Sequence, residues 1–211
     1  MIRIKVCGMY DPLNVKGTAE ARPDFMGFIF YPGSPRYIGT EPDPDLFLNV
    51  PSDILKTGVF VNENLRNVLD LAFRTGLNLI QLHGNESPAY CYQLRSSGLK
   101  IIKTFSVTGF VDFELLEPYV PACDYFLFDT KTEKFGGSGI KFDWGKIAGY
   151  HLDKPFFISG GIGPEDSGLL RTLENKGFFA VDVNSRFETS PGIKNISLLK
   201  TFIDDIKKEQ L

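Results

Sequence analysis

The sequence has 211 residues, of which 43% are hydrophobic, and it carries a formal net charge of −3. This length suits one domain, and the slightly acidic balance lacks the basic surface of a nucleic-acid-binding protein, so we expect no nucleic-acid partner. Three cysteines (Cys7, Cys91 and Cys123) are an odd number without paired spacing, which argues against a disulfide framework and a zinc site. There is no charged-then-apolar leader and no apolar run long enough to span a bilayer. We therefore expect a soluble, cytoplasmic protein without a membrane partner.

Short apolar segments recur along the chain, each ending in a small or polar residue and followed by a helix-like stretch. Near-continuous apolar runs are typical of parallel strands that are covered on both faces, and the abundant phenylalanines are expected to fill such a core. The eight segments are "IRIKVCG" (2–8), "DFMGFIF" (24–30), "KTGVFV" (56–61), "LNLIQLHG" (77–84), "LKIIKTF" (99–105), "DYFLFDT" (124–130), "KPFFISGG" (154–161) and "GFFAVDVNS" (177–185).

Helix signals lie between and after these segments. Residues 62–76 show apolar positions at helical spacing and end in glycine, and 87–98 start with serine followed by proline. Residues 163–177 and the C-terminal tail read the same way, whereas the four prolines of "PRYIGTEPDPDLFLNVPSD" predict a short or distorted second helix. Eight β-then-α units predict an α/β fold, a single (β/α)₈ TIM-barrel domain over 1–211. A doubly wound open sheet is the alternative.

In such a barrel, functional side chains come from the C-terminal ends of the strands. The first strand offers Lys5 and Cys7, which share one face because side chains alternate along a strand. A thiol beside an ammonium is placed to become a thiolate, since a nearby cation lowers its pKa. The other reading of Cys7 is a buried structural cysteine, the role expected for Cys91 and Cys123.

The sixth strand ends near Asp129 and is followed by a charged, glycine-rich segment. A carboxyl group against the aromatic residues of this strand is desolvated and can hold a proton near neutral pH, which would make Asp129 a general acid. A helix N-cap, or an ion pair with Lys131 or Lys134, is the equally weighted alternative.

The loops after strands seven and eight favour a phosphate site. Gly160 and Gly161 let backbone N–H groups close around an anion, and Asn184 and Ser185 follow the last strand. A plain tight turn would also explain the two glycines. Asp182 is ambiguous, because it could support Asp129 electrostatically or be structural.

Two further side chains at the strand ends are candidates for substrate contacts. Arg36 carries a fixed-charge fork suited to a substrate carboxylate, although a solvated loop arginine explains it as well. His83 shares a face with Gln81 and reads more readily as a hydrogen-bonded structural residue than as a catalytic one.

The chain resembles the phosphoribosylanthranilate isomerase family of tryptophan biosynthesis. The resemblance rests on "IKVCGM", "GFIFYPGSPRYI", "GVFVN", "LIQLHGNE", "FLFDT…GGSGIKFDW", "FFISGGI" and "VDVNSRFETSPGIKN", which occur in order over residues 4–195. It implies a (β/α)₈ fold and an Amadori aldose-to-ketose rearrangement of a phosphosugar. Neither a metal nor a cofactor is implied, because the nitrogen of the substrate is the electron sink.

The resemblance also implies roles for single residues. Cys7 would be the general base and Asp129 the general acid, Arg36 would lie near the anthranilate carboxylate, and His83 would belong to the substrate site. Gly160, Gly161, Asn184 and Ser185 would bind the phosphate.

One departure falls in the phosphate loop. The usual "SSGVE" of the family is "NSRFE" here, with Arg186 in place of glycine. This change either removes a backbone approach to the phosphate or adds a cation to it. The first motif also differs, continuing as "CGMY" instead of "CGIT".

The rival readings are a different phosphosugar barrel enzyme and a barrel that binds a phosphorylated ligand without turnover. Only two histidines, His83 and His151, are present, which disfavours the metal-dependent enzymes of the first group. The oligomeric state is left open between a monomer and a homodimer.

Overall fold

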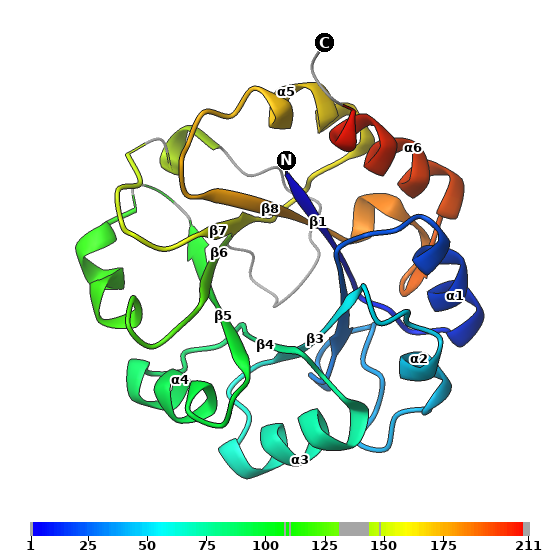
Figure 1. Ribbon diagram of the computed structural model, residues 1–211, viewed down its shortest axis with the longest axis horizontal. Coiled ribbons are helices and arrows are strands. Elements are labelled where there is room, and N and C mark those ends of the chain that lie inside the picture. The colour runs from blue at the N-terminus through cyan, green and yellow to red at the C-terminus, as the bar shows by residue number, and fades with distance from the viewer. Residues whose placement is uncertain (1, 108, 110, 131–143, 148, 209–211) are drawn as a thin grey trace.

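The fold is a closed barrel of eight parallel strands in this computed structural model, which describes residues 2–107, 109, 111–130, 144–147 and 149–208. Each strand pairs with the next along the chain, and β1 also pairs with β8, which closes the ring (Figure 1). The (β/α)₈ prediction is confirmed and the open doubly wound sheet is wrong. The strands are β1 (Arg3–Cys7), β2 (Phe25–Ile29), β3 (Leu55–Phe60), β4 (Leu79–Leu82), β5 (Lys100–Val107), β6 (Tyr125–Thr130), β7 (Phe156–Ile158) and β8 (Phe178–Val183).

Helices surround the barrel and begin where the sequence signals predict. The Asn64 side chain accepts from the backbone N–H of Asn67, and the helix that follows ends at Gly76 with φ 62°. Ser87 caps the next helix, with proline at its first position. None of the helices in the described residues is long and apolar enough to cross a membrane. The α-helices are α1 (Pro12–Glu20), α2 (Asp45–Leu48), α3 (Leu65–Thr75), α4 (Pro88–Arg95), α5 (Ser167–Arg171) and α6 (Ile196–Lys207), and the 3₁₀ turns are η1 (Phe113–Tyr119), η2 (Trp144–Ile147), η3 (Pro164–Asp166) and η4 (Ser185–Phe187).

Two elements differ from the expectation. The predicted helix over 163–177 is only the turn η3 and the five-residue α5, because the Asn175 side chain accepts from the Gly177 backbone N–H and forms a turn that competes with helix. A short hairpin, β9 (Glu188–Ser190) and β10 (Ile193–Lys194), follows β8 and was not predicted. The distorted second helix is confirmed, since α2 has four residues.

Side-chain alternation divides the core into two layers. Phe126 and Phe128 on β6 point outward into the large apolar cluster between the strands and the helices, whereas Leu127 points into the barrel. The inner cluster also contains Phe25 and Phe157, whose ring centroids lie 5.4 Å apart. Each fully buried phenylalanine contributes about 1.5–3 kcal/mol through the apolar surface that it removes from water. The expectation that the phenylalanines fill the core is confirmed.

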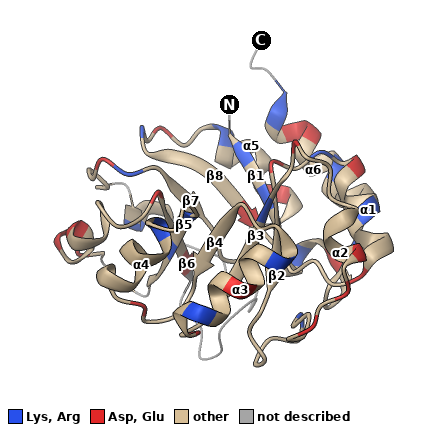
Figure 2. Cartoon of the chain, turned by 60° about the horizontal axis from the view of Figure 1, so that its bottom comes forward, with Lys and Arg blue, Asp and Glu red and all other residues tan. Residues whose placement is uncertain are grey.

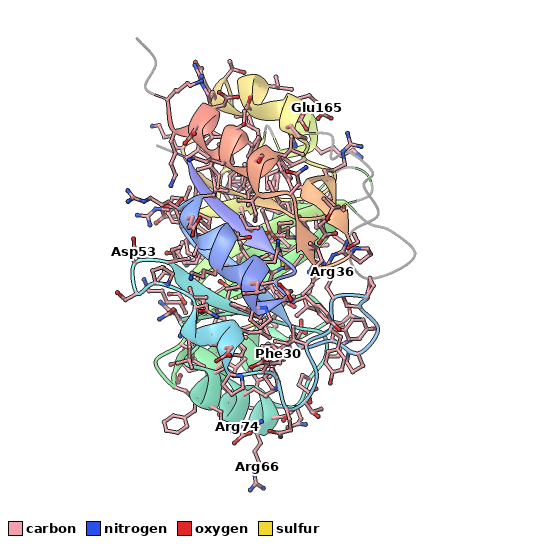
Figure 3. All side chains as sticks on the ribbon, turned by 90° about the vertical axis from the view of Figure 1, so that its right-hand side faces the viewer. Phe30, Arg36, Asp53, Arg66, Arg74 and Glu165 are labelled. Carbon is pink, nitrogen blue, oxygen red and sulfur yellow. The ribbon has the colours of Figure 1, made fainter. Side chains whose placement is uncertain are left out.

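Charged residues of both signs are scattered over the outside of the barrel (Figure 2). In side view, Asp53, just before β3, lies toward one end of the barrel, and Arg36 and Glu165 lie toward the other (Figure 3). The loops after β2 and β7 therefore share the end at which parallel strands finish.

Candidate active site

Cys7 and Lys5 point into the barrel from β1, as the alternation predicts. Lys5 Nζ lies 2.9 Å from both carboxylate oxygens of Asp182, its register partner on β8. Lys5 is fully buried, and Cys7 is only 5% exposed. Gly27 on β2 makes room for this group, because a Cβ there would lie 2.8 Å from Cys7 Sγ and 3.2 Å from Lys5 Nζ.

The protonation of Cys7 differs from the expectation. Burial raises the pKa of the thiol, and Lys5 opposes this rise without cancelling it, so the resting group is a thiol. Burial alone would lower the pKa of Lys5, but Asp182 more than offsets it and holds that pKa above its usual value. The positive charge of Lys5 is thus largely compensated by Asp182, which explains why the neighbouring ammonium does not suffice to ionise Cys7.

Asp129 faces His83 across the mouth of the barrel. Its Oδ2 lies 3.3 Å from His83 Nε2, and each side chain is 15% exposed. Gln81 Nε2 lies 3.2 Å from His83 Nδ1 and donates to Thr104 Oγ1. With the Gln81 amide oriented so that its nitrogen faces the ring, Gln81 donates to Nδ1 and the ring proton of His83 lies on Nε2, toward Asp129.

The surroundings of Asp129 differ from the aromatic walls that the sequence suggests. Phe126 and Phe128 face the helices, and His83 Nε2 is a polar partner of Asp129 at 3.3 Å. The glycine-rich loop, with Lys131 and Lys134, lies in 131–143, outside the described residues.

Asp182 connects the two halves of this arrangement. Burial raises its pKa, Lys5 lowers it, and the negative charge of Asp129 raises it further. Asp182 therefore pairs with Lys5 on the Cys7 side and also interacts electrostatically with Asp129.

The two predicted phosphate loops directly follow β7 and β8. Gly160 and Gly161 have φ of 92° and 65°, backbone conformations that residues with a side chain rarely adopt. Asn184 directly follows β8, and Ser185 begins the turn η4. Arg186, which stands where the family usually has glycine, forms an ion pair within the protein. Its guanidinium lies 2.9 Å from Glu165 Oε1 and joins the loops after β7 and β8.

Arg36 belongs to a buried charge cluster, which we define as Arg36, Glu188 and Lys194. Arg36 donates from Nε and Nη2 to the Glu188 carboxylate, with the shortest contact at 2.6 Å, and is only 5% exposed. Lys194 Nζ donates to Glu188 Oε1 at 2.6 Å and to Asn184 Oδ1 at 2.7 Å. Arg36 is therefore not the solvated loop arginine considered from the sequence.

Glu188 and Lys194 had no role in the sequence-based prediction. Both lie in the stretch "ETSPGIK", which contributed to the resemblance but contains no strand-end signal. The sequence did contain a hint of a hairpin: Glu188 and Lys194 follow the last strand and lie on either side of a Pro-Gly turn signal.

A second buried ion pair fixes the loop after β4, which carries His83. Lys103 Nζ donates to Glu86 Oε2 at 2.9 Å and to the Gly84 carbonyl at 2.7 Å. Glu86 Oε1 in turn accepts from the Asn62 backbone N–H at 2.8 Å. The side chains of Lys103 and Glu86 are 3% and 2% exposed, and neither residue had a role in the sequence analysis.

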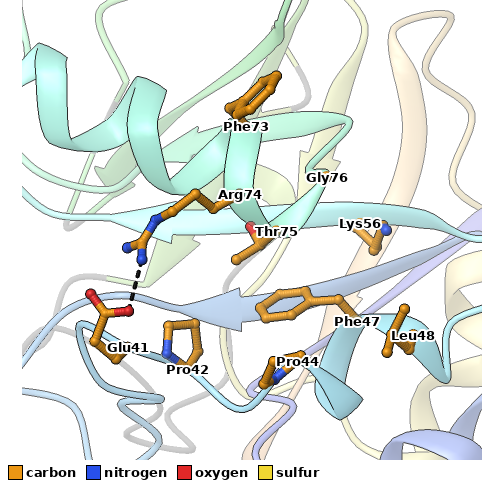
Figure 4. A pocket seen from close by; sticks show the side chains of 10 residues that line it. All are labelled: Glu41, Pro42, Pro44, Phe47, Leu48, Lys56, Phe73, Arg74, Thr75 and Gly76. Atoms are coloured by element: carbon orange, nitrogen blue, oxygen red, sulfur yellow. Dashed lines mark hydrogen bonds and ion pairs between the residues drawn. The ribbon is translucent and has the colours of Figure 1, made fainter.

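A surface hollow of about 430 Å³ lies outside the barrel between α2 and α3 (Figure 4). Lys56, Phe47 and the Arg74–Glu41 pair line it, and the rim includes the strongly exposed Phe73. It contains none of the predicted site residues. Among the described residues, no three His, Cys, Asp or Glu side chains converge to hold a metal ion.

Comparisons with known proteins point to one family. The family model of N-(5'phosphoribosyl)anthranilate (PRA) isomerase matches residues 4–205. The N-(5'-phosphoribosyl)anthranilate isomerase of Phocaeicola vulgatus is 41% identical over 98% of both chains, and that of Parabacteroides distasonis is 42% identical over 96% of this chain and 92% of the relative.

Solved structures show the same likeness. The phosphoribosyl anthranilate isomerase of Thermotoga maritima superposes with a TM-score of 0.87 at 35% identity, over 98% of this chain and 99% of that one. An isomerase in complex with reduced 1-(o-carboxyphenylamino)-1-deoxyribulose 5-phosphate superposes with a TM-score of 0.83 at 32% identity, with the same coverage. By its sequence, its barrel and the order of its motifs, the chain belongs to the N-(5'-phosphoribosyl)anthranilate isomerase family.

Proposed function

We propose that Cys7 and Asp129 are the general base and general acid of this isomerase. The enzyme converts N-(5'-phosphoribosyl)anthranilate into 1-(2-carboxyphenylamino)-1-deoxyribulose 5-phosphate, a step of tryptophan biosynthesis. The observation that carries the assignment is the opposed placement of the two groups. Cys7 ends β1 beside Lys5, and Asp129 stands near the end of β6, with Asp182 interacting with both sides.

The reaction requires one proton to be given and another to be taken. Asp129 protonates the furanose ring oxygen, the C1–O bond breaks, and the lone pair of the substrate nitrogen forms an iminium. Cys7, as thiolate, removes the C2 proton, and the C–H electrons flow toward the nitrogen to give an enolamine. Tautomerisation of the enolamine gives the ketone.

His83 acts by holding Asp129 in this scheme. Its Nε2–H lies 3.3 Å from Asp129 Oδ2, and Gln81 fixes the other ring nitrogen. We therefore propose that the main role of His83 within the substrate site is to orient the side chain of Asp129.

The two charged ends of the substrate are assigned to opposite loops. Gly160, Gly161, Asn184 and Ser185 would receive the phosphate, and the positive φ of the two glycines supports this assignment. Arg36 would meet the anthranilate carboxylate through Nη1, which makes no hydrogen bond within the described part of the chain.

Turnover of wild type, Cys7→Ala and Asp129→Asn on freshly prepared substrate tests the assignment. The loss of anthranilate fluorescence would report turnover, and Cys91→Ala would serve as a matched cysteine control on α4. We expect both site variants to lose at least about 10²-fold in kcat, the usual range for a general acid or base, and the control to keep its rate. A folded Cys7→Ala protein with normal turnover would remove the cysteine from the mechanism, and a normal Asp129→Asn protein would do the same for the acid.

The cellular setting is also a proposal. All three cysteines are free and buried, which suits a reducing compartment such as the cytoplasm. A Thermotoga maritima relative is described as dimeric, and sedimentation of this protein would distinguish a monomer from a homodimer.

A further inference from the structure

The mechanism needs a thiolate at Cys7, and the pair beside it carries no net charge. Lys5 and Asp182 are in contact through both carboxylate oxygens and compensate each other. Burial raises the pKa of Cys7, and Lys5 and Lys194 are the cations that oppose the rise. Because Lys5 is already matched by Asp182, any net positive charge that faces Cys7 has to come from another group.

The charge cluster of Arg36, Glu188 and Lys194 has this property. Two cations share one carboxylate, so the cluster carries one net positive charge. Its three side chains are at most 6% exposed, so water screens this charge weakly.

The cluster lies against the backbone that follows Cys7. Gly8 has φ 77°, and a Cβ there would lie 2.6 Å from Arg36 Cδ and 2.7 Å from Asn184 Oδ1. The same Asn184 oxygen accepts from Lys194 Nζ at 2.7 Å. Arg36 and Lys194 both interact electrostatically with Cys7. Arg36 from the loop after β2 and Asn184 at the end of β8 thus lie against Gly8, the residue next to the base, and Lys194 of the β9–β10 hairpin donates to Asn184.

We propose that Glu188 and Lys194 of the β9–β10 hairpin are positioning residues that, together with Arg36, stabilise the Cys7 thiolate through the single net positive charge of their cluster. Glu188 sets the size of this charge. Burial would raise its pKa, but Arg36 and Lys194 hold that pKa below its usual value, so Glu188 is ionised at neutral pH. Burial lowers the pKa of Lys194, and the contact of its Nζ with Glu188 Oε1 at 2.6 Å opposes this lowering. The inference rests on the proposed role of Cys7.

Two single variants change the cluster charge in opposite directions. Lys194→Met removes the net charge and leaves the cluster neutral, whereas Glu188→Gln leaves two cations uncompensated. The first should raise the pH at which Cys7 ionises by roughly one unit, and the second should lower it by a similar amount, the size expected for a charge close to a thiol. The groups facing Cys7 from other elements, Lys5 and Asp182, stay unchanged.

The double variant Lys194→Met/Glu188→Gln separates charge from structure. In this variant Arg36 is the only charged member of the cluster, so the cluster again carries one net positive charge. The hydrogen bond between the side chains of residues 188 and 194 is lost. The ionisation of Cys7 should therefore return to within about 0.3 units of wild type, a small part of the shift of each single variant. A purely structural role of the pair predicts the opposite, a double variant at least as perturbed as either single one.

Two readouts are needed. The pH dependence of kcat/KM gives the midpoint of the acidic limb, where the base loses its proton. The pH dependence of iodoacetamide alkylation, followed by mass spectrometry of the tryptic peptide 6–16 that contains Cys7, gives the same midpoint without turnover. Lys200→Met, which removes an exposed lysine on α6, is the charge-matched control and should leave both midpoints in place.

Opposite shifts in the two single variants, with recovery in the double variant, would establish the role of the cluster. Shifts of the same sign, or unchanged midpoints in folded variants, would overturn it. If the alkylation midpoints move as expected but Cys7→Ala keeps normal turnover, the cluster controls the thiol and the proposed function of Cys7 is the part that fails.

Discussion

Replacing Lys103 by methionine should strongly destabilise the barrel. The change removes three donated hydrogen bonds, to the carbonyls of Leu82 and Gly84 and to the Glu86 carboxylate. It also leaves Glu86, whose side chain is 2% exposed, as a buried carboxylate without its cation. Breaking a buried ion pair from one side costs about 3–5 kcal/mol, which for a chain of this length corresponds to a fall in Tm of roughly 6–20 °C.

Urea unfolding followed by the fluorescence of the single tryptophan, Trp144, measures this loss. Lys103→Met/Glu86→Gln should recover about half of it or more, because the uncompensated charge is gone while an oxygen still accepts from the Asn62 N–H. Arg74→Met, which breaks the exposed pair with Glu41, is the control and should cost less than about 1 kcal/mol. A loss below about 1 kcal/mol for Lys103→Met, or a double variant less stable than the single one, would refute the reasoning.

Three further outcomes are expected. Gly27→Ala would place a Cβ 2.8 Å from Cys7 Sγ, so we expect about 1–3 kcal/mol of destabilisation and a turnover lower by about 10²-fold, whereas Gly168→Ala, whose Cβ would meet no atom within 4 Å, should keep its rate. Equal rates for the two alanine variants would contradict the crowding argument. Arg36→Lys keeps the charge but loses the planar fork, so steady-state kinetics should show a raised KM, and an unchanged KM would place the carboxylate elsewhere. Because the folded pKa of Glu188 lies below its unfolded value of 4.5, its contribution to stability is present above that pH and is lost as the pH falls below it. The unfolding free energy should therefore drop more steeply below about pH 4.5 in wild type than in Glu188→Gln, and parallel curves would show that the pairing contributes nothing.

The barrel could be predicted from the sequence because its strands are apolar runs bounded by turn residues, a local signal that does not depend on distant contacts. Gly76 marked the end of one helix, and Ser87 with Pro88 the start of the next, for the same reason, since capping is local. The helix predicted over 163–177 failed where a side chain, Asn175, bonds to the backbone and forms a turn. The spacing of apolar residues, on which the helix prediction rested, carries no information about such side-chain-to-backbone hydrogen bonds.

The site was predictable to the extent that its groups end strands. Cys7 and Asp129 do so, and their positions at the carboxyl ends of two strands were enough to predict that they lie at the barrel mouth. The ionisation of Cys7 could not be predicted, because it depends on how deeply folding buries the thiol and on Asp182 taking up the charge of Lys5, a contact across 177 residues. Lys194 was missed for a related reason, since a lysine in a loop looks solvated until folding buries it.

The Lys5–Asp182 pair has a consequence for biosynthesis of the enzyme. The pair bridges β1 and β8, the first and last strands, and Lys194 is added to the site from beyond β8. A chain that has emerged from the ribosome only through β7 has Lys5 without its carboxylate partner Asp182, so with Cys7 as the proposed base we expect it to be inactive. We expect activity to appear when β8 pairs with β1, so that the recovery of turnover during refolding would time the docking of the last strand.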